Sequence, residues 1–197
     1  MTKRLGISCL EALKKSGPPV IIVVASYESE AIFNACQDHG IDVHAFCDSE
    51  KRKSQETFCD LEVVHTPSLP DRFSEARFVI ASQQVQDVVD QLTGLGFGEF
   101  YSALELLEGY DVKRYEHRIA ASYMETRISV YKTTHAAYFD DEKTYMRSLD
   151  VMITTKCSLK CESCSNLMQY YLVPSNVAVE QTLDAIKTLD ECVDEIS

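Results

Sequence analysis

Residues 19–30, which read PVIIVVASYESE, decide the fold of this chain. The first part, Pro19–Ala25, is a short continuous apolar run, which is typical of a strand buried on both faces. From Glu28 to His39, small and apolar residues fall on one helical face, and Gly40 marks the end of the predicted helix. A buried strand followed directly by such a helix indicates a parallel α/β sheet.

The same alternation continues to residue 109. It predicts four further strands: Val43–Cys47, Leu61–Val64, Arg77–Ala81 and Phe100–Tyr101. It also predicts a helix at Gln83–Leu95, and a short helix at Ile7–Lys15 is predicted before the first strand. Strands that alternate with helices form right-handed βαβ units on a parallel sheet. Residues 1–109 therefore predict a Rossmann-like α/β domain.

The turn after the first strand lacks the usual features of a dinucleotide site. No glycine occurs in Val23–Glu30, although a pyrophosphate needs close backbone approach at this turn. Glu28 and Glu30 are expected to repel phosphate. Asp48 ends the second strand, where a ribose-binding acid would lie, but Asp is also a common turn residue. The sequence thus disfavours nucleotide binding at this turn. The domain resembles degenerate Rossmann-like domains that are fused to other enzymes, and this resemblance implies a docking or substrate-positioning role.

Residues 110–150 carry a loose helical stripe of Ile, Tyr and Ala side chains. This pattern predicts one or two packed helices that connect two domains. His117 and His135 each stand alone on a helical face, so we expect ordinary surface or core histidines rather than metal ligands.

Composition and charge exclude several classes of function. The chain has 197 residues and a formal net charge of −12, which argues against broad nucleic-acid binding because that needs basic surface. No apolar run reaches the roughly 18 residues of a membrane span, and the N-terminal residues do not resemble a signal peptide. We therefore expect a cytoplasmic protein.

The eight cysteines fall into different groups. Four occur singly beside apolar residues and are expected to be buried: Cys9, Cys36, Cys47 and Cys59. Cys157, Cys161 and Cys164 form a C-x3-C-x2-C motif among polar residues. They follow Val151–Thr155, a predicted strand. Three closely spaced thiolates can hold a [4Fe–4S] cluster and leave one iron open, and Lys156 and Lys160 would offset the cluster's negative charge.

Structural zinc and a ligand-free remnant are the alternatives for this motif. Structural zinc usually takes four ligands in two pairs, whereas no histidine follows His135. The remaining thiol, Cys192, borders the apolar stripe of a helix predicted from Val179 to about Glu195, so we expect it in the core.

The motif and the strand before it resemble the radical S-adenosylmethionine (radical SAM) superfamily. That family carries a C-x3-C-x2-C loop after the first strand of a partial (β/α)6 barrel. Residues 165–171, SNLMQYY, are similar to members from bacterial surface-polysaccharide gene clusters, which also have an N-terminal Rossmann-like domain. The resemblance is specific over residues 150–172 and only architectural over residues 20–109.

The resemblance implies that Cys157, Cys161 and Cys164 hold three irons of a [4Fe–4S] cluster and that S-adenosylmethionine chelates the fourth. An electron from a reductant such as flavodoxin or ferredoxin would cleave S-adenosylmethionine to methionine and a 5′-deoxyadenosyl radical. That radical would abstract hydrogen from a small substrate, expected to be a sugar or sugar nucleotide. Ser163 stands where the family usually has an aromatic residue near the adenine, so the usual adenine contact is not expected there.

Length and glycine distribution lead to a further expectation. Six βα units need on the order of 180 residues, at ~30 per unit, whereas 40 residues follow Cys157. The last glycine is Gly109, so the family's Gly-Gly-Glu motif is missing. We therefore expect residues 151–197 to begin a barrel that this chain does not complete, leaving it catalytically incomplete. The alternative is a binding or regulatory module with a vestigial or zinc-binding cysteine loop.

Overall fold

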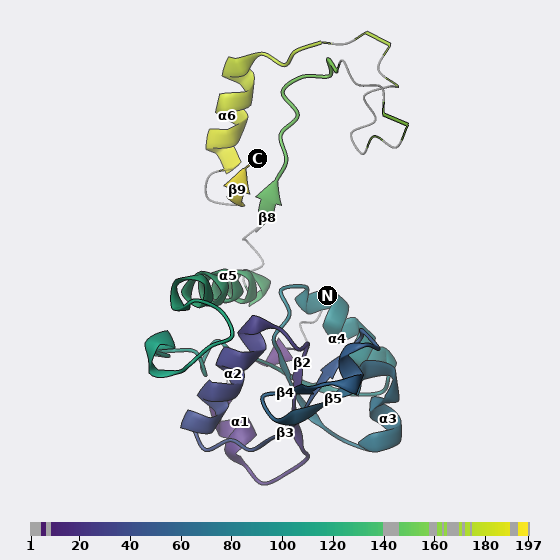
Figure 1. The fold of residues 1–197 in the computed structure, drawn as a ribbon, viewed down its shortest axis with the longest axis vertical. Coiled ribbons are helices and arrows are strands. Elements are labelled where there is room, and N and C mark those ends of the chain that lie inside the picture. Colours follow the sequence, from purple (N-terminus) through teal and green to yellow (C-terminus); the bar gives the residue numbers. More distant parts are fainter. Residues whose placement is uncertain are drawn as a thin grey trace. The chain divides into compact units, whose positions relative to one another are not determined.

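The computed structural model describes residues 5–6, 9–139, 146–157, 161–162, 164, 170, 172–173, 175–189 and 193–196. The chain divides into two compact units, Met1–Asp141 and Glu142–Ser197 (Figure 1). Each unit has its own sheet, and each is described by itself below.

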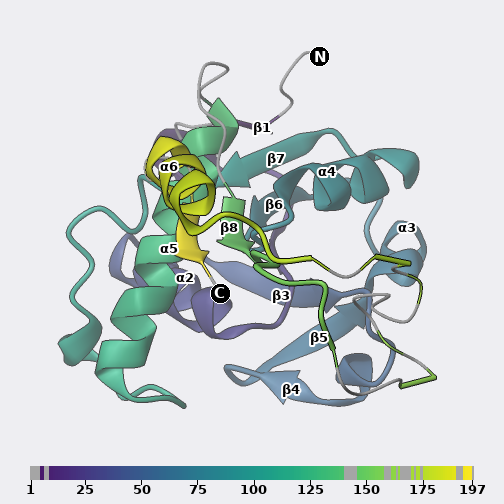
Figure 2. The ribbon, with the colours of Figure 1, turned by 90° about the horizontal axis from the view of Figure 1, so that it is seen from above.

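The first unit is built on a seven-stranded sheet with the order β1-β7-β6-β2-β3-β5-β4 (Figure 2). The strands are β1 (Leu5–Gly6), β2 (Val20–Val23), β3 (Val43–Asp48), β4 (Thr57–Phe58), β5 (Leu61–His65), β6 (Arg77–Ile80) and β7 (Glu99–Ser102). All neighbouring strands are parallel except β4 and β5, which form an antiparallel hairpin. Numbered from β2, the five longer strands have the order 3-2-1-4-5, as in doubly wound folds.

Helices cover both faces of this sheet. They are α1 (Leu10–Lys14), α2 (Tyr27–Asp38), α3 (Leu69–Arg72), α4 (Val85–Gly94) and α5 (Ala121–Phe139). Along β2, Val20 and Ile22 enter the hydrophobic cluster that includes residues of α2 and α5. Ile21 and Val23 enter the opposite cluster, which includes residues of α4. Burial on both faces explains why β2 is a continuous apolar run.

The predicted α/β class is confirmed for this unit. Each of the five predicted strands and both longer predicted helices are present, with ends that differ by a few residues. The prediction missed β1 and β4. The region predicted as a connector contains α5, which buries Met124, Ile128 and Tyr131 in the first core, so this helix is part of the first compact unit.

Both histidines of this region have hydrogen-bond partners inside the first unit. The predicted helical position is confirmed for His135 and is wrong for His117, which lies in the segment before α5. The ring of His117 hydrogen-bonds through Nδ1 to Glu30 Oε1 and through Nε2 to the Val112 carbonyl, each at 3.1 Å. His135 is completely buried on α5.

The second unit contains β8 (Met146–Leu149), α6 (Val179–Leu189) and β9 (Val193–Ile196). The two strands pair in parallel, with Met146 opposite Val193 and Leu149 opposite Ile196. A helix between two parallel strands makes a βαβ unit. The part of the chain that the structure describes has no helix of the length and apolarity that a bilayer crossing needs.

Two predictions for the second unit were wrong. The strand expected at Val151–Thr155 is replaced by β8, which lies earlier in the chain, and Thr154 forms only an isolated bridge with Asn176. The helix expected to reach about Glu195 ends at Leu189. Residues 193–196 pair with β8, and this tertiary pairing overrides the helical spacing of their side chains. Cys192 lies outside the described residues.

Candidate functional site

The cysteine motif lies in the connection from β8 to α6. In a parallel βαβ unit, this connection starts at the carboxyl end of the first strand, which is where α/β folds place their binding sites. Cys157, Cys161 and Cys164 are all free thiols. Cys157 and Cys161 are exposed and Cys164 is partly buried. The motif therefore presents unoxidised sulfur donors close to the surface of the second unit.

Two short segments close the base of this connection, and we call them the clasp: residues 153–155 and residues 175–177. The Thr155 amide donates a hydrogen bond to the Ser175 carbonyl at 2.9 Å, and the Val177 amide donates to the Ile153 carbonyl at 3.0 Å. The Ser175 amide also donates to Thr155 Oγ1 at 2.7 Å. The clasp holds together the two ends of the loop that carries the cysteines.

The donor chemistry of the loop fits an iron–sulfur cluster. Iron–sulfur clusters are held by cysteine thiolates, and three of these donors stand within eight residues here. Among the described residues, however, no three His, Cys, Asp or Glu side chains converge closely enough to hold a metal ion. The structure therefore does not bring the three sulfurs together. Metal–ligand bonds can themselves supply the free energy that gathers ligands. Lys156 is exposed next to Cys157, whereas Lys160 and Ser163 lie outside the described residues.

The other four described cysteines have a different environment. Cys9, Cys36 and Cys47 are buried, as predicted, whereas Cys59, also predicted to be buried, is only partly buried. Burial raises the pKa of Cys9, Cys36 and Cys47 to about 12 and the pKa of Cys59 to about 11. Because the thiolate is the form that binds metal, these protonated thiols are poor ligands.

The turn after β2 has an unusual backbone conformation at Val24. Val24 has a φ of +75°, an unusual backbone conformation for a β-branched residue. Neighbouring groups hold it there: the Val24 amide donates to the Cys47 carbonyl at 2.7 Å, and Ser29 Oγ donates to the Val24 carbonyl. This valine takes the backbone conformation for which a nucleotide-binding turn commonly uses glycine.

The two acidic residues after this turn are buried and have basic side chains as partners. Glu28 forms an ion pair with Arg127. Glu30 hydrogen-bonds to His117 at 3.1 Å and lies 3.9 Å from Arg118. These partners come from α5 and the segment before it, so Glu28 and Glu30 do not face the turn as exposed charges.

Asp48 organises the same turn rather than standing free for a ribose. Its buried carboxylate accepts hydrogen bonds from the Ala25 amide at 3.0 Å and the Glu50 amide at 2.9 Å. Its Oδ2 also forms an ion pair with Lys53 Nζ at 2.9 Å. Asp48 therefore fixes the chain after β2 and directs Lys53.

Comparisons with known proteins add no family to this description. A scan against protein-family models found no match, and no curated protein or solved structure matched the chain significantly.

Proposed function

We propose that this chain carries the cluster-binding loop of a radical SAM enzyme, with Cys157, Cys161 and Cys164 as ligands of a [4Fe–4S] cluster. One observation supports this proposal above all: the only C-x3-C-x2-C motif in the sequence consists of free cysteines in the connection after β8. The other described cysteines are at least partly buried and have raised pKa values, so they do not compete for iron.

The proposed roles of the chain's own residues follow from their chemistry. Three thiolates would bind three irons and leave the fourth open to the amino and carboxylate groups of S-adenosylmethionine. When bound, the cluster supplies the single electron that cleaves S-adenosylmethionine reductively. Lys156 would offset part of the negative charge of the thiolate-bound cluster, and the clasp would hold the ends of the loop together. A sugar or sugar nucleotide as substrate rests on the sequence resemblance alone.

Anaerobic reconstitution with iron and sulfide tests the proposal. We expect about four irons per chain and broad absorption near ~400 nm. Replacing Cys157, Cys161 or Cys164 by Ala should each abolish cluster binding, since a lost thiolate leaves an iron without its ligand. The matched control is Cys47→Ala, which removes a buried thiol of the first unit and should retain the cluster.

The alternative readings give different results in the same experiment. A colourless protein that binds one zinc ion would overturn the proposal in favour of a zinc-binding module. Binding of neither metal would identify the loop as vestigial and leave a binding or regulatory module as the function.

A further inference from the structure

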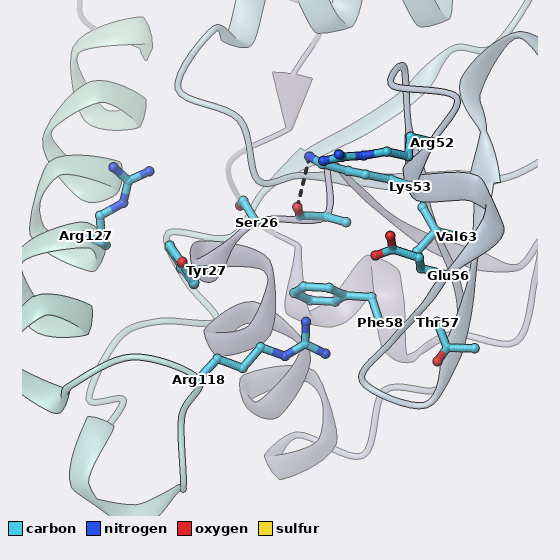
Figure 3. A pocket seen from close by; sticks show the side chains of 11 residues that line it. Ser26, Tyr27, Arg52, Lys53, Glu56, Thr57, Phe58, Val63, Arg118 and Arg127 are labelled. Carbon is cyan, nitrogen blue, oxygen red and sulfur yellow. Dashed lines mark hydrogen bonds between the residues drawn. The ribbon is translucent and has the colours of Figure 1, made fainter.

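The first unit contains a cavity of about 420 Å³ beside the turn after β2 (Figure 3). Its walls come from three stretches far apart in sequence: the start of α2, residues 52–63, and the region from Arg118 to Arg127. The first two stretches follow the carboxyl ends of β2 and β3. In open parallel sheets, ligands bind outside the carboxyl ends of the strands. The cavity therefore occupies the usual position of a ligand site in this architecture.

Four cationic side chains line the cavity, compared with one carboxylate, that of Glu56. Arg52 and Lys53 lie on one side of it, and Arg118 and Arg127 come from the segments across from them (Figure 3). The whole chain carries a formal net charge of −12, so this concentration of positive charge runs against its overall balance. The start of α2 adds the partial positive charge of a helix N-terminus.

Buried acids behind the cavity wall hold three of these cations. Glu28 pairs with Arg127, Glu30 lies 3.9 Å from Arg118, and Asp48 lies 2.9 Å from Lys53. Lys53 Nζ also donates to the Ala25 carbonyl at 3.3 Å and lies 3.8 Å from Glu50, and Arg52 Nε lies 3.6 Å from Glu50. Each guanidinium has five N–H donors, more than these acids use. Among the described residues, three buried side-chain atoms of these pairs have no hydrogen-bond partner: Arg127 Nε, Glu28 Oε2 and Glu30 Oε2.

Aromatic side chains complete the wall. The guanidinium of Arg118 lies over the Phe58 ring, 4.3 Å from its centroid, and the partly exposed ring of Tyr27 stands at the start of α2. Such rings offer apolar surface to the organic part of a ligand.

We propose that this cavity binds an organic phosphate of the nucleoside diphosphate class. The phosphates would lie between Arg52 and Lys53 on one side and Arg118 and Arg127 on the other. The organic part would contact Phe58 and Tyr27. The forked N–H donors of three arginines suit the several oxygens of a diphosphate better than one carboxylate, and they can bind it although acids pair with each cation. All residues that line this cavity belong to the first unit, and none is a cysteine of the motif, so the inference goes beyond the cluster site of the proposed function.

Isothermal titration of the full chain with UDP, GDP, ADP and CDP tests the inference. We expect saturable binding of at least one of them and binding at least about tenfold weaker for its nucleoside, which lacks the phosphates. Arg52→Gln and Arg118→Gln should each weaken the diphosphate by about tenfold. Both side chains are at least half exposed, at 81% and 51%, so the fold should tolerate their replacement.

Lys51→Gln and Arg114→Gln are the matched controls, because each removes an exposed cation near a tested residue but outside the cavity wall. They should leave the affinity unchanged. The inference is overturned if no nucleoside diphosphate binds saturably, or if R52Q and R118Q keep wild-type affinity. It is also overturned if the control variants lose as much affinity as R52Q and R118Q. Inorganic pyrophosphate binding as tightly as every nucleoside diphosphate would also overturn it, since the organic part would then contribute nothing. The heat of binding reports on this cavity, whereas the iron content reports on the cysteine loop. The two proposals can therefore fail independently.

Discussion

His135 is a titratable residue that is completely buried in the core of the first unit. Its ring nitrogens hydrogen-bond to Ser102 Oγ and to the Ser82 carbonyl, both at 2.9 Å. Its ring also stacks on Tyr131, with 3.9 Å between centroids. Burial lowers the pKa of His135 to about 4, because the core disfavours the charged imidazolium. The side chain is therefore neutral in the folded protein at neutral pH.

This lowered pKa predicts acid sensitivity. Below the ordinary histidine pKa of 6.5 the unfolded chain binds a proton at this position, whereas the folded protein does not until the pH approaches 4. The contribution of His135 to stability should be complete above pH 6.5 and lost as the pH falls to about 4. The loss amounts to roughly 3 kcal/mol at most. Urea unfolding at a series of pH values measures it.

His135→Gln should unfold with a shallower pH dependence than the wild type over this window. The control is His39→Gln, which replaces a partly exposed histidine and should keep the wild-type slope. If the unfolding free energies of H135Q and the wild type changed equally with pH, His135 would not be the source of the acid sensitivity.

At the scale of elements, the β4–β5 hairpin turns through two residues with positive φ, Cys59 at 49° and Asp60 at 61°. Two-residue hairpin turns of this kind favour Asn-Gly or Asp-Gly, and left-handed backbone costs an ordinary residue about 1–2 kcal/mol. The hairpin therefore keeps some backbone strain in the wall next to the cavity.

Asp60→Gly should relieve part of this strain. We expect a gain of roughly 0.5–1 kcal/mol in the free energy of unfolding, after allowing for the extra entropy of glycine in the unfolded chain. The measurement is the urea midpoint followed by circular dichroism. Asp90→Gly serves as the opposite control, because it puts glycine inside α4 and should lower the midpoint. A lower midpoint for D60G would contradict the strain argument.

The same hairpin shows where prediction from the sequence succeeded and where it failed. Strand β2 was found because burial on both faces leaves a continuous apolar run, and helix α2 because burial of one face leaves a helical apolar period. The strand β4 was missed because it has two residues and its turn reads Cys-Asp rather than a common turn pair. Strand β9 was missed because parallel pairing with β8 is a distant contact that local spacing does not encode.

The two candidate sites also differ in how far the sequence alone predicted them. The cysteine motif is contiguous, so its spacing alone identified Cys157, Cys161 and Cys164. The cavity cations come from residues 52–53, 118 and 127, and only the fold brings them to one wall. The basic run Lys51–Lys53 in an acidic chain was the one available signal. Sequence reasoning also treated Glu28 and Glu30 as exposed charges, because their partners lie about ninety residues away.

For the molecule as a whole, the two units differ in how much they bury. Both hydrophobic clusters of the described chain consist of residues between Cys9 and Phe139. In contrast, none of the residues of α6 is buried. The internal stabilisation visible in the structure is thus concentrated in the unit Met1–Asp141.

A chain of residues 1–141 should therefore fold alone. We expect one cooperative urea transition, with a midpoint equal to that of the main transition of the full chain, because apolar burial provides most of the folding free energy. Circular dichroism and tyrosine fluorescence should report the same midpoint. Aggregation or a broad, probe-dependent transition of this shorter chain would show that the second unit is needed for the first to fold.

The clasp at the base of the cysteine loop should allow the length of this loop to vary. Backbone hydrogen bonds supply much of its closure, so its formation depends little on which side chains lie between Cys157 and Pro174. The entropy lost on closing a flexible loop grows only with the logarithm of its length, and doubling the length adds about 0.6 kcal/mol. Insertions between Cys164 and the second half of the clasp should therefore be tolerated, provided that the spacing of the three cysteines is kept. This stretch can vary in length among related chains at little thermodynamic cost.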